Sequence, residues 1–204
     1  MNPRARTALV LGLGAQRLVE LRLSAGNRRR GGNAEQASRA TYPLMVATHV
    51  ALFAVCAWPR PRRVPRAIEV VAFLGVGAAA ALRIWVIRSL GDDWNVTAHV
   101  RTGMRVVTGG PYRYIRHPNY VAVALEFASL PVAVGAAPEG LVLSLANAAV
   151  LVPRIRAEER LLDGIPGYSD AFRGVPRFVP RPGRRSRQSP ASANQSLGVS
   201  EVND

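Results

Sequence analysis

Five stretches of apolar residues, separated by arginine-rich segments, constrain what this chain can fold into more than any other feature. A helix needs about 20 mostly apolar residues to cross the hydrocarbon core of a bilayer, and some of the stretches are shorter than that. The shortness of the last stretch is explained if its helix continues beyond the membrane, through Arg154 to Leu162. The pattern predicts an all-α fold, a polytopic membrane bundle of about five transmembrane helices. The stretches cover residues 7–23, 42–58, 67–87, 120–134 and 141–152.

The distribution of arginine predicts how these helices are oriented. All 27 residues in the combined lysine and arginine count are arginine, and many lie after the first, third and fifth stretches. Those three regions fall on one side of the membrane, and positively charged loops are enriched on the cytoplasmic side. The loop at residues 59–66 runs against this rule, because it carries four arginines on the opposite side. We expect the N-terminus outside and the C-terminus inside.

The location and the class of partner follow from composition. Abundant Ala, Gly and Pro, with arginine in place of lysine, favour a G+C-rich genome and therefore a bacterial plasma membrane. A formal net charge of +14 would suit a nucleic-acid-binding protein. The arginines lie between apolar stretches and in the tail, without interleaved aromatic residues, so bilayer headgroups are the favoured anionic partner. We expect no nucleic-acid partner, and the oligomeric state stays open.

Metal catalysis is not expected from the inventory of ligand residues. The chain has only three histidines, His49, His99 and His117, and its single cysteine lies within an apolar stretch. These residues cannot supply a recognisable cluster of metal ligands. Cys56 is predicted to be a residue of the core.

The chain is long enough for one domain, which we place at residues 1–180, with its catalytic part at about residues 90–180. Beyond residue 180 the sequence is rich in Arg, Ser, Pro, Asn and Gln and has almost no apolar content. Such a composition cannot offset the entropy lost on ordering. Residues 181–204 are therefore predicted to form a disordered tail.

Two kinds of residue interrupt the apolar stretches. Gly-Xaa-Gly pairs occupy residues 12–14 and 75–77. They lie inside apolar stretches and not at a strand-to-helix turn, which favours close helix packing over a phosphate-binding loop. Arg83 lies near the end of the third stretch, where its long side chain is predicted to snorkel toward the headgroups.

The most informative segment is TGGPYRYIRHPNY, at residues 108–120. The residue before a proline is pushed out of helical geometry, so His117 is predicted to end the loop and Pro118 to begin a helix. The free N–H groups of that helix start favour an anion, and tyrosine rings can stack on a base or lie over a sulfonium cation. S-adenosylmethionine carries all three of these groups: an anionic carboxylate, a base and a sulfonium cation. The candidate rings are Tyr112, Tyr114 and Tyr120, which alternatively form an interfacial belt.

The second informative segment is VPRIRAEERLL, at residues 152–162. On a helix Arg154 and Glu158 are four residues apart and share a face, where a simple ion pair is one interpretation. Charged side chains near the membrane interior are costly, so those that are retained usually face a cavity or a partner. Arg154 is a candidate anchor for an anionic substrate, and Glu158 is a candidate partner for a cationic cofactor.

Both segments resemble the isoprenylcysteine carboxyl methyltransferase family in order and spacing, over roughly residues 90–180. That family shows Gly-Xaa-Tyr, then Arg-His-Pro-Xaa-Tyr entering a helix, then an arginine four residues before the first of two glutamates. Here the corresponding segments are 110–112, 116–120 and 154–159. The resemblance implies a methyltransferase of the integral membrane whose cofactor, S-adenosylmethionine, binds in a C-terminal cytoplasmic region.

The resemblance also implies roles for individual residues. Arg154 would contact the substrate, and Arg154 and Glu158 are the candidate catalytic residues. An upstream cofactor contact corresponds to Thr97 or to His99. The other implied cofactor contacts are Met104, Arg105, Val106, Val107, Tyr112, His117, Pro118, Asn119, Tyr120 and Glu158.

The methyl acceptor is the least determined part of the interpretation. After the glutamates this chain reads IPGYSDAFRGVPRFVP, where the family often has Phe-Gly and spaced tyrosines, so the segment that closes over the cofactor is expected to differ. Similar small bacterial members methylate long-chain phenolic or pyrone lipids. We expect a carboxylate or a phenolic or enolic oxygen on a lipophilic, isoprenylcysteine-like or alkylresorcinol-like acceptor.

Two other functions fit parts of the pattern. Sterol-reductase-like membrane enzymes also carry an Arg-His-Pro-Asn-Tyr segment but use NADPH, and the paired glutamates and short chain favour methyl transfer over that chemistry. A non-catalytic scaffold that binds lipid through its arginines is the alternative from another class. Binding of S-adenosylmethionine, of NADPH or of neither distinguishes the three.

Overall fold

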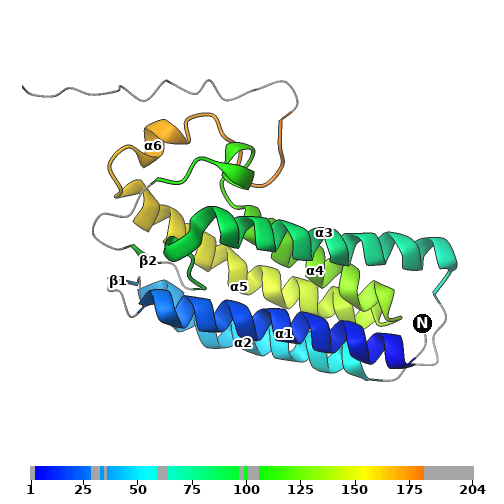
Figure 1. The fold of residues 1–204 in the computed structure, drawn as a ribbon. Coiled ribbons are helices and arrows are strands. Elements are labelled where there is room, and N and C mark those ends of the chain that lie inside the picture. Colours follow the sequence, from blue (N-terminus) through cyan, green and yellow to red (C-terminus); the bar gives the residue numbers. More distant parts are fainter. Residues whose placement is uncertain are drawn as a thin grey trace, which may run out of the picture.

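The computed structural model describes residues 3–28, 33–34, 36–58, 64–96, 99–100 and 106–181. Most of this part of the chain forms five long helices: α1 (Pro3–Arg28), α2 (Gln36–Ala57), α3 (Arg66–Leu90), α4 (Pro118–Ala133) and α5 (Ala137–Asp163). The shorter elements are β1 (Asn33–Ala34), the 3-10 helix η1 (Gly91–Asp93), β2 (His99–Val100), the 3-10 helix η2 (Gly110–Arg113) and α6 (Tyr168–Ala171). Figure 1 shows the long helices side by side, with η2 and α6 at the end of the bundle away from the N-terminus.

The predicted helical fold is confirmed, and each apolar stretch corresponds to one long helix, with two of the stretches ending one residue beyond theirs. The last helix also continues as predicted, because α5 runs past Arg154 to Asp163. Two helices of the described ranges, Arg66–Asp93 and Ala137–Asp163, are long and apolar enough to cross a membrane. Leu74 and Leu145, one on each, are more than 60% exposed, as expected for side chains that face lipid. The total of about five transmembrane helices stays a prediction.

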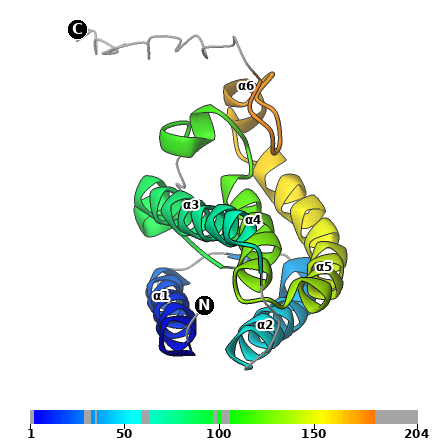
Figure 2. The same cartoon turned by 90° about the vertical axis from the view of Figure 1, so that its right-hand side faces the viewer.

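The helices pack in pairs around a small apolar core. α3 packs along α4, α2 packs along α5, and α4 also contacts α5. Figure 2 shows α1 at the edge of the bundle. The core joins α2, α4 and α5 through Leu52, Phe127, Leu130 and Leu151, and the predicted burial of Cys56 is confirmed.

The close helix packing predicted for the two Gly-Xaa-Gly pairs is found at only one of their four glycines. A Cβ atom at Gly75 would lie 2.2 Å from the Ser129 hydroxyl oxygen, so α3 approaches α4 closely at this position. Among the described residues, a Cβ atom at Gly12, Gly14 or Gly77 would have no neighbour within 4 Å, and the prediction of tight packing was wrong for these three. They lie on helix surfaces that no other helix covers closely.

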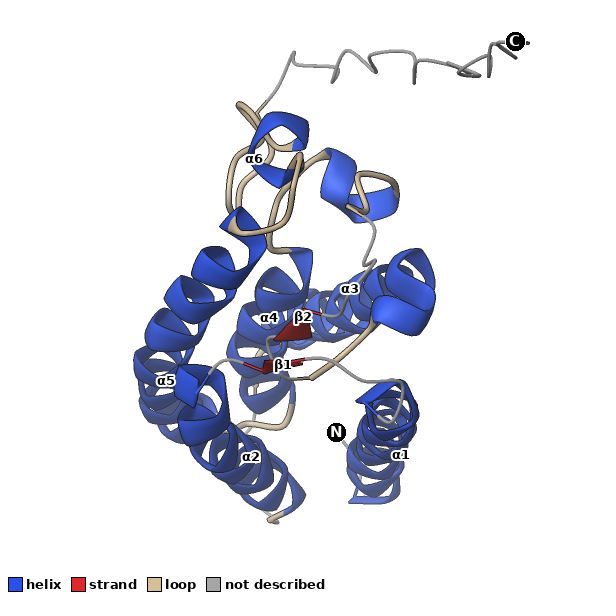
Figure 3. Ribbon diagram, turned by 90° about the vertical axis from the view of Figure 1, so that its left-hand side faces the viewer, coloured by secondary structure: helices blue, strands red, loops and turns tan. Residues whose placement is uncertain are grey.

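One short β ladder was not predicted from the sequence. Asn33 pairs with Val100 and Ala34 pairs with His99 in an antiparallel register. Figure 3 shows this pair of strands between α1 and α5, and β2 contacts α5. The ladder connects the loop after α1 to the segment that leads toward η2. Of the predicted disordered tail, residues 181–204, all but Arg181 lie outside the described residues.

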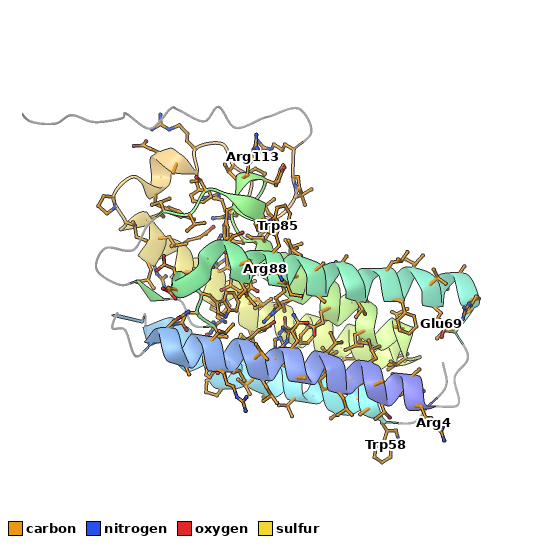
Figure 4. All side chains as sticks on the ribbon, in the orientation of Figure 1. Arg4, Trp58, Glu69, Trp85, Arg88 and Arg113 are labelled. Atoms are coloured by element: carbon orange, nitrogen blue, oxygen red, sulfur yellow. The ribbon has the colours of Figure 1, made fainter. Side chains whose placement is uncertain are left out.

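Charged and tryptophan side chains lie toward both ends of the bundle. Arg4, Trp58 and Glu69 lie at the end away from α6, whereas Arg88 and Arg113 lie toward the α6 end (Figure 4). Trp58 is 70% exposed at the end of α2. Tryptophan and charged residues that flank an apolar middle are typical of helices that meet a membrane interface.

Candidate active site

A cavity of about 720 Å³ extends between the helices from the α6 end of the bundle. All five long helices contribute to its wall, together with η2 and α6. Near η2 the wall is polar, with Tyr112 and Asn119, and along α1 and α2 it is mostly apolar, with Leu18 and Phe53. A cavity of this size and mixed character is typical of a site for a small molecule.

The polar end of the cavity is built around the start of α4. His117 caps the helix with φ −123° and ψ 58°, outside helical geometry, and Pro118 is the first helical residue. The sequence His-Pro therefore begins the helix as predicted, because proline disfavours helical geometry in the residue before it. His117 is buried, and Asn119 also lines the cavity.

Two successive glutamates on α5 face the start of α4. The Tyr120 hydroxyl donates a hydrogen bond to Glu158 Oε2 at 2.6 Å. His117 Nε2 lies 3.0 Å from Glu159 Oε1 and donates to it, because a carboxylate oxygen accepts. His117 Nδ1 lies 3.8 Å from Glu158 Oε1. The contact between α4 and α5 thus brings the two sequence segments into one site.

The segment that follows α6 crosses the same helix start. Arg177 donates from Nη2 to Glu159 Oε2 at 2.7 Å, so this carboxylate bridges Arg177 and His117. The backbone N–H groups of Arg116 and His117 donate to the carbonyl oxygens of Pro176 and Arg177, at 2.9 and 3.0 Å. The C-terminal segment is thereby fixed against the site, although its sequence departs from the family pattern.

Two tyrosines supply hydroxyl groups to the cavity wall. Burial raises the pKa of Tyr168 to about 12, and the nearby Glu158 carboxylate acts on this pKa in the same direction. Burial and Glu158, in that order, also raise the pKa of Tyr112 well above its ordinary value. Both hydroxyls therefore stay protonated at neutral pH and are available as hydrogen-bond donors. Phe172 packs on Tyr168 with ring centroids 4.7 Å apart and shares the wall.

The Gly-Gly-Pro turn positions η2 against the end of α3. Gly110 has φ +59°, and a Cβ atom there would lie 2.2 Å from the Ser89 hydroxyl oxygen. Only glycine suits a position that combines left-handed geometry with so close an approach. Tyr112 lines the cavity from this turn. Tyr114 is 50% exposed and packs against Trp85, so it does not share the ligand-facing role predicted for all three tyrosines.

Arg154 lies one helical turn before Glu158 on α5, and both residues line the cavity. Arg154 is only 2% exposed. Its Nη2 donates to the Val96 carbonyl oxygen at 2.7 Å, and its Nη1 to Thr41 Oγ1 at 3.4 Å. These contacts hold the guanidinium in the wall, where its charge favours an anionic group in the cavity.

A group of charged side chains lies in the interior of the bundle, away from its ends. Arg83 is 6% exposed and donates from Nε to Glu20 Oε2 at 2.7 Å, so the prediction that it snorkels was wrong. The ion pair with a glutamate of α1 keeps Arg83 inside the bundle, because that pairing satisfies the charge without exposure to the headgroups. Arg17 bonds to the same Glu20.

Most of the residues predicted for the site surround this cavity. Met104 and Arg105, like Thr97, lie outside the described residues, and His99 belongs to β2 with its side chain undescribed. The roles of all of them stay predictions. Every other predicted contact lines the cavity: Val106, Val107, Tyr112, His117, Pro118, Asn119, Tyr120, Arg154 and Glu158.

Sequence reasoning missed several residues of the site. Glu159 was seen only as the second of two glutamates, and its contacts with His117 and Arg177 depend on tertiary packing. Tyr168 lies in the segment that departs from the family pattern, and a tyrosine beside a Pro-Gly turn was the available signal. Within the described ranges, no group of three or more His, Cys, Asp or Glu residues could hold a metal ion.

Residues 70–164 match the model of the isoprenylcysteine carboxyl methyltransferase family. This part of the chain is similar to that family. The matched region runs from α3 through α5 and therefore contains the start of α4, Arg154 and both glutamates. It begins earlier than the motifs suggested and ends before α6, while α1, α2 and the C-terminal segment lie outside it.

Three curated relatives are similar to this chain. The uncharacterized protein YpbQ of Bacillus subtilis is 37% identical over 94 residues, 44% of this chain and 56% of YpbQ. The cobalt-zinc-cadmium resistance protein CzcN of Cupriavidus metallidurans is 35% identical over 53% of this chain and 47% of CzcN. The nickel-cobalt-cadmium resistance protein NccN of Alcaligenes xylosoxydans xylosoxydans is 31% identical over 56% of this chain and 51% of NccN. The chain thus spans about half the length of the relatives it matches.

Proposed function

We propose that this chain is a membrane methyltransferase that uses S-adenosylmethionine to methylate an oxygen of a lipophilic acceptor. The family match supports methyl transfer, and the helices of the described ranges support a membrane setting. The observation that carries the proposal is the cavity itself, because one end is polar and offers hydrogen-bonding groups. The rest of the wall is mostly apolar, apart from a few charged and polar side chains deeper in the bundle. A cationic cofactor and a lipid chain fit those two parts.

The residues present fit S-adenosylmethionine. Glu158 supplies a carboxylate beside Tyr112 and Tyr120, whose rings can lie over a sulfonium cation. His117 Nδ1 and Asn119 Oδ1 are buried and have no hydrogen-bond partner among the described residues. Because Nε2 donates to a carboxylate, Nδ1 of a neutral His117 is an acceptor. His117 Nδ1 and Asn119 Oδ1 can therefore both accept hydrogen bonds from the ammonium group of the cofactor. When bound, the cofactor supplies a methyl group that an oxygen nucleophile can accept.

Arg154 is the proposed anchor for the acceptor. Its guanidinium can orient a carboxylate or a phenolate, which are both planar anions. An acceptor that arrives as an anion needs no general base, so the chain contributes mainly by holding the reacting oxygen in position and excluding water. Burial of Arg154 strengthens its attraction to that oxygen, because the interaction is weakly screened away from solvent.

The apolar part of the cavity is the proposed site for the lipid chain. Leu18 of α1 and Val46 and Phe53 of α2 line it, and Leu18 and Val46 are also exposed on the outside of the bundle. A chain in the bilayer can therefore reach the cavity sideways between helices. We place the protein in the bacterial plasma membrane, with its N-terminus outside and the site at the cytoplasmic face, as the arginine distribution predicts.

The acceptor-rich polar end also favours this function over an NADPH-dependent reductase. NADPH carries several phosphate charges, and the carboxylate of Glu158 in the cavity wall would repel them. A non-catalytic lipid-binding scaffold would need neither the buried His117 nor the paired glutamates. The names of two relatives concern resistance to metals. We do not propose that role for this chain, because no group of metal ligands is found among its described residues.

The test is a calorimetric titration of the purified full chain, in detergent, with S-adenosylmethionine and separately with NADPH. Saturable binding of S-adenosylmethionine alone is expected, followed by transfer of its labelled methyl group to a long-chain carboxylate or phenol. Binding of NADPH alone would establish the reductase. Binding of neither, by protein shown to be folded, would establish the scaffold.

A further inference from the structure

The strongest unassigned feature is the charged group inside the bundle, which we call the inner ion cluster. It consists of Arg17 and Glu20 on α1, Arg83 on α3 and Glu126 on α4. Arg17 bonds to both glutamates, at 2.7 Å to Glu20 Oε2 and also to Glu126 Oε2. Arg83 Nε bonds to Glu20 Oε2 at 2.7 Å. Two cations and two anions face one another, so the formal charges cancel.

The cluster lies deeper in the bundle than the proposed active site. Glu126 follows Tyr120 by six residues on α4, which places it about 9 Å farther along the helix axis. Arg17, Glu20 and Arg83 line the same cavity as Arg154 and Glu158. A molecule bound with its reacting oxygen at Arg154 and its chain in the apolar part passes this cluster.

A purely structural role does not account for the cluster well. A buried ion pair seldom stabilises a fold more than apolar residues of similar volume, because both charges lose their hydration. Ionisable residues among transmembrane helices are costly, and those retained usually mark a pathway or a binding site. Arg17, Glu20 and Arg83 lie in a cavity wall and not in a closed contact between helices, which agrees with binding.

The cluster also has hydrogen-bonding capacity that the described residues leave unused. Arg17 Nε and Arg83 Nη1 are buried donors without a hydrogen-bond partner there, and Glu126 Oε1 is a buried acceptor without one. His49 lies in the cavity wall within electrostatic reach of Arg17 and Arg83. Its Nδ1 donates to the Met45 carbonyl oxygen at 2.8 Å, so Nε2 of the neutral ring is a further acceptor.

We propose that the inner ion cluster is a second polar subsite, which recognises a hydroxyl group carried on the hydrocarbon chain of the acceptor. A hydroxyl is the simplest group that both donates and accepts, and it therefore satisfies unused donors and an unused acceptor together. The cluster is neutral as a whole, so it favours an uncharged polar group over a second anion. The inference deepens the proposed function, since it assumes that the cavity holds a lipophilic acceptor.

The test measures binding and does not depend on methyl transfer. The probes are pentadecylresorcinol and a series of the same molecule with one hydroxyl moved along the chain. Binding of each to the full chain in detergent is measured without cofactor. At one chain position the hydroxyl is expected to tighten binding about tenfold or more, the effect of hydrogen bonds to charged groups.

The variants remove the cluster while they keep the charge balanced. In Arg17→Met/Glu126→Met and in Arg83→Met/Glu20→Met the hydroxyl preference is expected to fall to within about twofold, with binding of the unhydroxylated probe retained. Arg22→Met, at an exposed arginine of the same helix, should keep the full preference. If a double variant does not fold, Glu126→Gln replaces it with little change of shape.

The outcomes separate this inference from the proposed function. Equal affinity for all probes in the wild type, absence of binding, or a preference that both double variants retain would overturn the subsite. Those results would not contradict the proposed function, which the titration with S-adenosylmethionine tests separately. Conversely, a hydroxyl preference in a protein that binds no S-adenosylmethionine would support the subsite and refute the methyltransferase.

Discussion

The Tyr120 hydroxyl and Glu158 Oε2 lie 2.6 Å apart, joined by a hydrogen bond between the first turn of α4 and the last third of α5. Tyr120 belongs to the segment at residues 108–120 and Glu158 to the segment at residues 152–162, so this contact joins the two segments into one site. It also holds the Glu158 carboxylate toward the cavity, beside Tyr112 and Tyr168. Substitution of this carboxylate is therefore the most direct probe of the proposed cofactor site.

Glu158→Gln should weaken binding of S-adenosylmethionine by about tenfold or more, because the substitution keeps the size of the side chain and removes the charge that faces a cation. Calorimetric titration measures the effect. Glu139→Gln, at the other end of the same helix, serves as the matched control and should leave the affinity unchanged. Equal affinities for wild type and Glu158→Gln would remove Glu158 from the cofactor site.

Arg154→Ala should lower kcat/KM for the lipid acceptor by about 30-fold or more, since truncating one member of a buried charged contact costs about 2 kcal/mol at least. Arg154→Lys should recover only part of the loss, because an ammonium keeps the charge without the planar fork. Binding of S-adenosylmethionine should stay unchanged in both variants. Arg156→Ala removes an exposed arginine of the same helix and is the control. Unaltered kcat/KM in Arg154→Ala would refute its role as the anchor.

Gly75→Ala and Gly77→Ala should shift stability in opposite directions although they lie two residues apart on α3. A methyl group at Gly75 meets Ser129 across the contact with α4, so the first variant should lose about 1–3 kcal/mol. Gly77 has open space, and alanine there should gain about 0.5–1 kcal/mol from its better helix propensity. Thermal unfolding in detergent measures both. A stabilised Gly75→Ala would contradict the close approach of the two helices.

The raised pKa of Tyr168 predicts a change at alkaline pH. Burial disfavours the tyrosinate in the folded state, so its pKa moves from 10.0 to about 12. The stability that depends on the neutral hydroxyl is complete below pH 10 and is lost as the pH rises toward 12, because the unfolded chain ionises first. Tyr168→Phe should therefore resist unfolding better than the wild type in that window. In an absorbance titration of tyrosinate the variant should lack a component near pH 12, and loss of one near pH 10 would contradict the burial.

The sequence by itself determined the local structure of the site. His-Pro begins α4 because proline acts on the backbone of its neighbour, and no distant residue is needed for that effect. The reach of α5 through Arg154 and Glu158 to Asp163 likewise follows from local helical pattern. The two motifs could also be recognised as a pair, since their spacing along the chain is a property of the sequence alone.

Tertiary structure decided which side chains meet. Arg83 looked like an interfacial arginine because the sequence does not show that Glu20, 63 residues earlier, lies against it. Glu159 became a partner of His117 and Arg177 for the same reason, and Gly75 and Gly77 differ only in what the neighbouring helix presents. A charge or a glycine has one meaning against lipid and another against a packed helix. Only the packing of the helices decides whether such a residue faces lipid or another helix, because packing brings together residues that are far apart in the sequence.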